Sequence, residues 1–148
     1  MNGYRNILCA TDFSPTSEAA ADRASSLARS YGARLTLLHV VEYFPEDRSN
    51  EEIAPENVDP AHYREGRARE RLAAQAARLG GDVDIAQEVL ISEHAAKYEI
   101  ARFARDRQMD LIVVASHGWH GVGALLGSTA DGVLQRAPCD VLAVRATE

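Results

Sequence analysis

The sequence contains little cysteine, few aromatic residues, no long apolar run and no excess of basic side chains. Its two cysteines, Cys9 and Cys139, lie inside short apolar runs, where buried free thiols are more common than disulfides. No apolar run approaches the roughly 20 residues of a membrane-spanning helix, and the N-terminus has no signal-peptide pattern. The net charge of −6 argues against a surface for duplex nucleic acid. We therefore expect a cytoplasmic protein without membrane or nucleic-acid partners.

The remaining composition is that of an ordinary globular domain. A chain of 148 residues suits a single domain, residues 1–148, which can bury a core without disulfides or metals. Charged residues make up 26% of the chain, which argues against extended disorder. The acidic, proline-containing segment from Glu42 to Asp59 is expected to be a mobile surface loop and not a linker between domains.

Five short apolar runs alternate with helical patterns along the chain. The runs are Ile7 to Ala10, Leu35 to Val41, Val83 to Ile91, Leu111 to Ala115 and Val141 to Val144. The second, fourth and fifth are nearly continuous Val, Leu, Ile and Ala, a pattern typical of parallel strands covered on both faces. Strands that alternate with helices indicate right-handed crossovers. We therefore predict an α/β fold, a five-stranded doubly wound parallel sheet of order 3-2-1-4-5 with helices on both faces.

The segments between the apolar runs carry helix signals. The predicted helices are Pro15 to Tyr31, a second that starts after Asp59 and Pro60 and runs to Leu79, Ala96 to Gln108, and Ser128 to Arg136. Ser14 before Pro15 indicates an N-cap and a first helical position, and Gly32 indicates the end of the same helix. Tyr31 falls on the predicted inward face of that helix.

A binding site is expected at one end of the predicted sheet. Ligands of open α/β sheets bind beyond the carboxyl ends of the strands, where the strand order reverses. Here this switch point lies between the first and fourth strands, and it brings the loop Thr11 to Pro15 beside the glycine-rich segment Ser116 to Gly123. That segment leads to residues 127–129 at a helix start, where free N–H groups suit a phosphate. Ordinary turns, with Ser128 as a plain N-cap, are the alternative.

Several side chains near these loops admit two interpretations. Asp12 suits ribose hydroxyls or a divalent ion on phosphates, and equally an Asx turn ahead of the first helix; Thr11 shares this ambiguity. His117 suits a phosphate contact, whereas a zinc site on His117 and His120 lacks further ligands. Val40 offers backbone groups and an apolar wall to a base.

The sequence gives no catalytic residue. His39 lies inside the second apolar run and is expected to be a satisfied core or strand-end histidine. No GxSxG motif is present, and Ser116 and His117 are sequence neighbours, which does not make a triad. Catalysis therefore ranks below binding as a function.

Four parts of the chain resemble the universal stress protein family. They are Asn6 to Ser14, Leu37 to Val40, Asp110 to Gly118 with Leu126 to Thr129, and Ala137 to Arg145. The resemblance extends over nearly the whole chain. It implies a five-stranded α/β sandwich, a homodimer formed through the last strand from Val141 to Val144, and ATP binding in many members.

The family's nucleotide pattern is Gly, two residues, Gly, nine residues, and then Gly with Ser or Thr. Here Ala115 replaces the first glycine, and only eight residues separate Gly118, the second glycine, from Gly127. Trp119 stands where a basic residue is common. By resemblance, the nucleotide-binding residues are Ala10, Thr11, Asp12, Val40, Ala115, His117, Gly118, Gly127, Ser128 and Thr129.

We therefore expect a regulatory protein that binds ATP or AMP at the switch point, with Mg²⁺ reaching Asp12 through the nucleotide. A nucleotide-free dimeric scaffold, in which Ala115 and Trp119 close the pocket, is the main alternative. A slow ATP-hydrolysing enzyme with a metal on Asp12 ranks below both, because no nucleophile and base are paired in the sequence. The sequence does not specify any protein partner.

Overall fold

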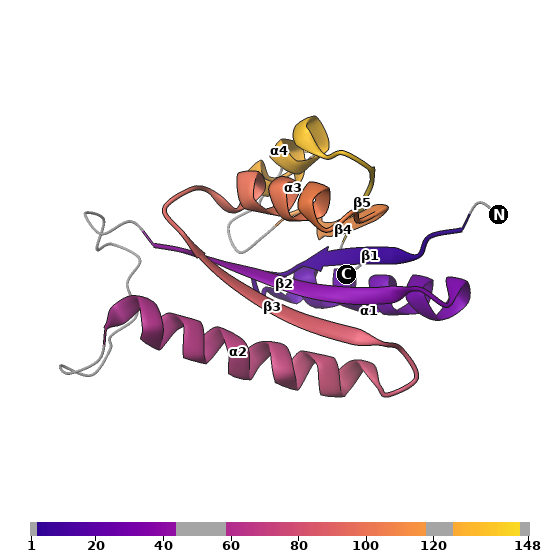
Figure 1. Ribbon diagram of the computed structural model, residues 1–148, viewed down its shortest axis with the longest axis horizontal. Coiled ribbons are helices and arrows are strands. Elements are labelled where there is room, and N and C mark those ends of the chain that lie inside the picture. The colour runs from indigo at the N-terminus through magenta and orange to yellow at the C-terminus, as the bar shows by residue number, and fades with distance from the viewer. Residues whose placement is uncertain (1–2, 44–58, 118–125, 146–148) are drawn as a thin grey trace.

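The structure, a computed structural model, describes residues 3–43, 59–117 and 126–145. Strands and helices alternate along the chain, as Figure 1 shows. In chain order they are β1 (Asn6–Ala10), α1 (Pro15–Tyr31), β2 (Arg34–Glu42), α2 (Pro60–Leu79), β3 (Ile85–Ser92), α3 (Ala96–Asp106), β4 (Leu111–Ala115), α4 (Ser128–Arg136) and β5 (Asp140–Val144). Most of the expected acidic loop lies outside the described residues, as do Gly118, Trp119 and His120, and the predictions for them stay predictions.

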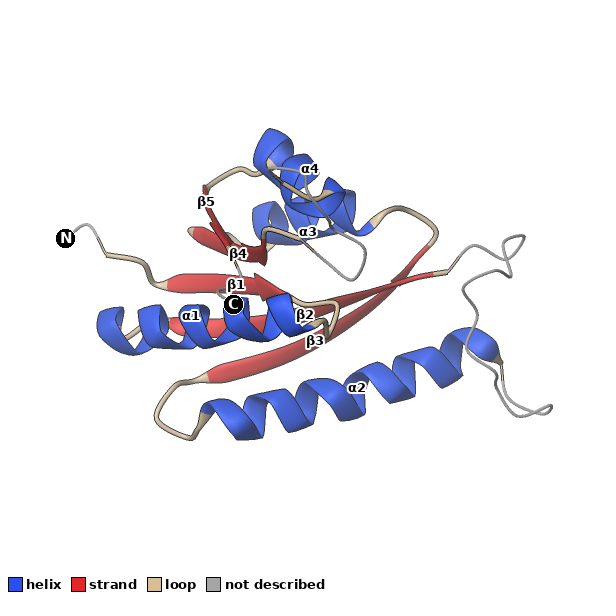
Figure 2. Cartoon of the chain, turned by 180° about the vertical axis from the view of Figure 1, so that it is seen from behind, coloured by secondary structure: helices blue, strands red, loops and turns tan. Residues whose placement is uncertain are grey.

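The sheet has the predicted topology. Its five strands are parallel and follow the order β3-β2-β1-β4-β5, so that β1 lies in the middle. Helices α1 and α2 cover one face, and α3 and α4 cover the other (Figures 1 and 2). This arrangement confirms the predicted α/β class and places the strand-order reversal between β1 and β4.

Local signals explain where α1 begins and ends. The Ser14 hydroxyl accepts a hydrogen bond from the Ser17 N–H, and Pro15 occupies the first turn, where its missing N–H costs nothing. Gly32 closes the helix at φ 64°, a left-handed conformation that glycine adopts without strain, and its N–H bonds to the Ala28 carbonyl. The predicted N-cap and stop of α1 are therefore confirmed.

Side chains along each strand alternate between two hydrophobic clusters, one on each face of the sheet. On β1, Ile7 and Cys9 pack toward α1 and α2, while Leu8 and Ala10 pack toward α3 and α4. Burying one such Leu or Ile side chain stabilises the fold by about 1.5–3 kcal/mol. Burial also raises the pKa of the Cys9 thiol to about 12, so Cys9 is a structural residue without thiolate reactivity.

Two predicted element boundaries are wrong. β3 begins at Ile85 and not at Val83, which is buried but lies in the turn that follows α2. α3 ends at Asp106 and not at Gln108, because Gln108 adopts φ 54° and leaves the helical conformation. Both errors concern buried or left-handed turn residues, whose sequence pattern resembles that of the neighbouring element.

Two predicted burial positions also need correction. Tyr31 is 43% exposed and stacks edge-on against Tyr4 at 5.4 Å, because it lies at the last turn of α1, beyond the edge of the core. Cys139 is half-buried in the turn before β5, whereas Cys9 is fully buried. Among the described helices, none is both long and apolar enough to cross a membrane.

Candidate functional site

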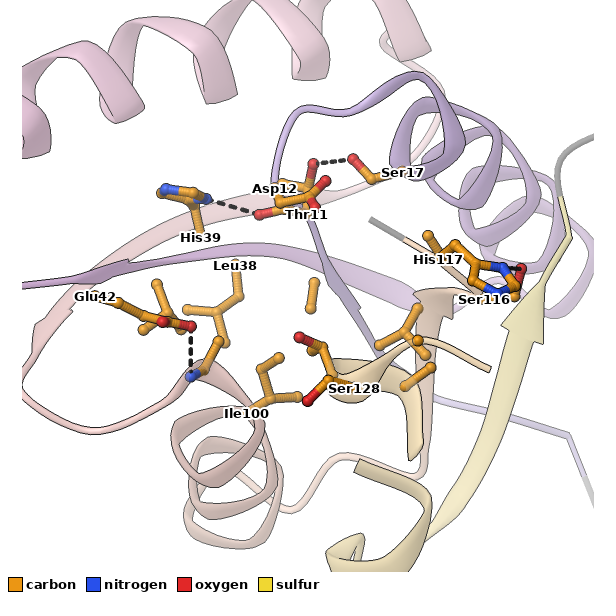
Figure 3. Close-up of a pocket in the computed structure, with 18 residues that line it drawn as sticks. Thr11, Asp12, Ser17, Leu38, His39, Glu42, Ile100, Ser116, His117 and Ser128 are labelled. Atoms are coloured by element: carbon orange, nitrogen blue, oxygen red, sulfur yellow. Dashed lines mark hydrogen bonds between the residues drawn. The ribbon is translucent and has the colours of Figure 1, made fainter. Parts of the chain in front are cut away.

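A pocket of about 520 Å³ lies beyond the carboxyl ends of β1, β2 and β4, where α3 and α4 begin (Figure 3). The apolar part of its lining comprises Ala10, Leu38, Val40, Ala96, Ile100, Val114, Ala115 and Ala130. The polar part comprises Thr11, Asp12, Ser116, His117, Ser128 and Thr129. A cavity of this size with a mixed lining suits a small organic ligand that has one apolar and one polar end.

The pocket brings together all of the predicted binding residues except Gly118, which lies outside the described residues. Ala115 stands where the family pattern has its first glycine. Its side chain packs with the cluster under α1, whereas the preceding Val114 packs with the cluster under α3 and α4. Ala115 also lines the pocket, so it lies where the core under α1 meets the pocket wall.

The turn after β1 is held by side-chain hydrogen bonds. The Thr11 hydroxyl lies 2.7 Å from the Ser17 hydroxyl and accepts the Phe13 N–H at 3.0 Å. Asp12 Oδ1 accepts the Ser14 N–H at 2.9 Å, which is the predicted Asx turn. Because Asp12 also lines the pocket, the turn fixes its carboxylate at the pocket wall.

A stack of side chains fixes the same turn from the other face of the sheet. The Phe13 backbone adopts φ 63°, and its ring lies 4.6 Å from the His39 ring and 5.6 Å from the Arg71 guanidinium. His39 Nδ1 donates a hydrogen bond of 2.7 Å to the Thr11 carbonyl, which confirms the expected satisfied histidine. Burial lowers the pKa of His39, with Arg71 acting in the same direction and the Thr11 bond opposing it.

Strand β2 extends beyond the end of β1 and leaves part of its edge open. Parallel pairing of the two strands ends at Ala10 opposite Leu38, and the last bond runs from the Thr11 N–H to the Leu38 carbonyl. Residues on β2 direct their N–H and C=O groups alternately toward β1 and β3. Val40 therefore directs its N–H and C=O toward the pocket, and no described residue pairs with them there.

The N-terminus of α4 supplies the other end of the pocket. Gly127 is the N-cap and Ser128 the first helical residue, so the alternative prediction of Ser128 as the N-cap is wrong. The Gly127 N–H bonds to the Ser116 carbonyl at 2.6 Å, which ties the helix start to the end of β4. No described side chain caps α4, and the N–H groups in the first turn of a helix have no partner within the helix, which suits this helix start to an anion.

Ser116 and His117 lie between β4 and α4 and contact each other. The Ser116 hydroxyl is 3.3 Å from His117 Nδ1, and Ser116 is almost fully buried. This contact between neighbours positions the imidazole at the pocket. Within the described part of the chain, no group of three or more His, Cys, Asp or Glu side chains is placed to hold a metal ion.

Sequence reasoning missed Glu42, which lines the pocket from the end of β2. Its Oε1 accepts the Ala96 N–H at the start of α3, at 2.9 Å. A sequence signal did exist, because Glu42 follows Val40 by two positions and so points to the same face of the strand. Ile100 of α3 also contributes to the apolar lining.

The fold and the pocket define a doubly wound α/β protein with a pocket at its switch point, where sheets of this class bind their ligands. Residues 3–145 match the universal stress protein family, and the chain belongs to this family. A curated relative, universal stress protein A homolog 1 of Coxiella burnetii, is 38% identical over 145 residues, which are 95% of this chain and 96% of the relative.

Solved structures agree with this assignment. The universal stress protein UspA from Lactobacillus plantarum is 27% identical and has a TM-score of 0.72, with 98% of this chain and 100% of that chain covered. A universal stress protein crystallised in complex with cAMP is also 27% identical and has a TM-score of 0.69, covering 99% of this chain and 100% of that chain.

Proposed function

We propose that this protein binds an adenine nucleotide, ATP or AMP, in the switch-point pocket and acts as a regulatory protein. The observation that carries the proposal is the open edge of β2 at Val40. One N–H and one C=O on the same strand match the acceptor nitrogen and the amino group of adenine, which lie side by side on one edge of the base. The apolar lining, including Leu38 and Ile100, then supports the faces of the ring.

The phosphates are assigned to the other end of the pocket. Ser128 and Thr129 present hydroxyls and N–H groups in the first turn of α4, and the positive end of the helix dipole favours an anion there. His117 lies beside this helix start as a further donor. Asp12 is placed to bind ribose hydroxyls, or Mg²⁺ carried in by ATP. The relative that was crystallised with cAMP supports the adenine-nucleotide class.

Calorimetric titration with AMP, and with ATP in the presence and absence of Mg²⁺, tests the proposal directly. The protein must first be unfolded and refolded to remove carried-over nucleotide. We expect micromolar binding and a rise in Tm with ligand concentration. No heat and no thermal shift at millimolar nucleotide would leave the nucleotide-free scaffold as the function, and phosphate release that is lost in Asp12→Ala would favour the hydrolase.

Thr129 offers a matched pair of variants for the phosphate end. Thr129→Glu places a negative charge in the first turn of α4, which stabilises the helix by about 0.3–1 kcal/mol but repels a phosphate. Thr129→Gln is the neutral control of the same size. We expect Thr129→Glu alone to weaken AMP binding by about tenfold or more while raising Tm slightly. Equal binding by the two variants would place the phosphate elsewhere.

We further propose that two copies of the chain pair through β5. This strand forms an edge of the sheet, and an apolar edge with open backbone groups invites pairing. An antiparallel pairing centred between Leu142 and Ala143 places Asp140 of one copy opposite Arg145 of the other, which makes the edge self-complementary in charge. A two-fold dimer contains this pair twice.

Sedimentation equilibrium tests this dimer. Arg145→Glu sets like charges opposite each other and is expected to weaken the dimer by roughly tenfold, because each exposed pair contributes about 0.2–1 kcal/mol. The double variant with Asp140→Arg is expected to restore the association. A wild-type monomer at tens of micromolar would reject the proposal, and an unaffected dimer in Arg145→Glu would reject this register.

A further inference from the structure

Two helices, α3 and α4, begin at the pocket, and they differ in whether a described side chain bonds to the N–H groups of the first turn. α4 begins at Ser128 behind Gly127, which has no side chain to cap it. α3 begins at Ala96 behind Ala95, which makes no cap bond either, but the Ala96 N–H is bonded to Glu42 Oε1. The carboxylate of Glu42, which belongs to β2, thus supplies the negative charge that favours the N-terminus of α3.

The carboxylate of Glu42 is only partly used by this contact. Figure 3 shows Glu42 at the pocket, with one carboxylate oxygen bonded to the start of α3. Arg64 bonds to the Glu42 main-chain carbonyl at 2.9 Å and not to the carboxylate. Among the described residues no cation pairs with this carboxylate, and no described donor bonds to its Oε2.

We propose that Glu42 orients the nucleotide in the pocket and selects its base, an inference that rests on the proposed function. Because Glu42 occupies the N-terminus of α3, the helix start that remains for the phosphates is that of α4. A carboxylate accepts hydrogen bonds from an amine and repels a carbonyl oxygen. Glu42 therefore favours AMP, whose base carries an exocyclic amine, over IMP, which carries a carbonyl oxygen at that position.

The direction of β2 agrees with this assignment. Along the strand the N–H of Val40 comes before its C=O, so an amine that donates to the Val40 carbonyl lies on the side of Glu42. The amine has two hydrogens, one for the Val40 carbonyl and one for the Glu42 carboxylate. Base and phosphate are thereby assigned to opposite ends of one pocket, with an acidic group at the first end and a helix N-terminus at the second.

Glu42→Gln separates the selection of the base from the capping of α3. Glutamine keeps an oxygen for the Ala96 N–H but removes the charge and can donate to a carbonyl oxygen. Calorimetry with AMP and IMP, on protein freed of nucleotide, measures the ratio of the two affinities. We expect the preference for AMP over IMP to fall by about tenfold in the variant, mainly through tighter binding of IMP.

Glu88→Gln is the matched control. It removes the same charge from β3, where the Glu88 carboxylate lies 3.8 Å from Arg107 and outside the pocket lining. The ratio of affinities is expected to stay at the wild-type value in this variant. A measurement of Tm for Glu42→Gln reports separately on the stability of α3.

Each outcome decides between the inference and its alternatives. A role limited to capping would change the two affinities together, so an unchanged ratio in Glu42→Gln overturns the inference while the proposed function stands. If the wild-type protein binds neither AMP nor IMP, the proposed function fails, and the inference fails with it. If Glu88→Gln lowers the ratio as much as Glu42→Gln, net charge and not contact sets the preference, which also overturns the inference.

Discussion

Replacing Val40 by proline tests the backbone part of the proposed site without touching any polar side chain. The Val40 N–H faces the region beyond the end of β1 and not β3, so proline removes no hydrogen bond of the sheet. Proline does remove the donor that is proposed to bind adenine. A buried acceptor left without its donor costs about 1–3 kcal/mol, which corresponds to roughly 5- to 150-fold in affinity.

Val40→Ala is the control. It also changes the packing of a side chain that is only 9% exposed, but alanine keeps the backbone N–H. Both variants are expected to lose about 1–3 kcal/mol of stability from packing, measured by urea unfolding. AMP affinity, measured by calorimetry, is expected to be roughly 5- to 150-fold lower in Val40→Pro than in Val40→Ala. Equal affinities would refute the backbone contact, and a stability loss several kcal/mol larger for proline would show that the N–H belongs to the sheet.

Two further predictions concern the pH dependence and packing of the fold. Burial lowers the pKa of His39 below its ordinary 6.5, so the contribution of neutral His39 to the free energy of unfolding is fully present above that pH. It is lost, at up to about 1.4 kcal/mol per pH unit, as the pH drops toward the folded pKa. His39→Gln should flatten this slope in urea unfolding from about pH 8 to about pH 5, and an equal slope in the variant would contradict the assignment. Gly66→Ala, where an added Cβ meets nothing within 4 Å, should stabilise α2 by about 0.5–1 kcal/mol. Gly132→Ala should instead cost about 1–3 kcal/mol, because its Cβ would lie 2.9 Å from Lys97 Cβ; a gain in stability there would refute the close packing of α3 and α4.

The order of the strands could be predicted because parallel sheets leave a strong signal. Continuous apolar runs, capped helices and regular alternation together favour few topologies, and the doubly wound order 3-2-1-4-5 is one of them. One boundary error arose where a residue other than glycine takes a left-handed conformation. Gln108 does so at φ 54° and ends α3 early, and nothing in its side chain signals that turn.

The candidate site could be predicted in outline, because strand-end loops converge at the switch point of any sheet with this order. Glu42 was missed because its role depends on tertiary contact. It meets Ala96, 54 positions away, only when the end of β2 and the start of α3 are placed together. The position of the Ala115 methyl group was also not predictable from the loop pattern, since it depends on which face of β4 the side chain occupies.

The open edge at Val40 follows from the unequal lengths of neighbouring strands. β1 ends at Ala10 because the Asx turn at Asp12 and the left-handed Phe13 direct the chain into α1. β2 continues to Glu42 because β3 pairs with it along its whole length. At the level of Val40 only β2 and β3 continue, so no strand pairs with the hydrogen-bonding groups of β2 that face the β1 side. A ligand in this position completes the sheet as a further segment of β1 would, which is why we expect the base to be selected by backbone groups first and by Glu42 second.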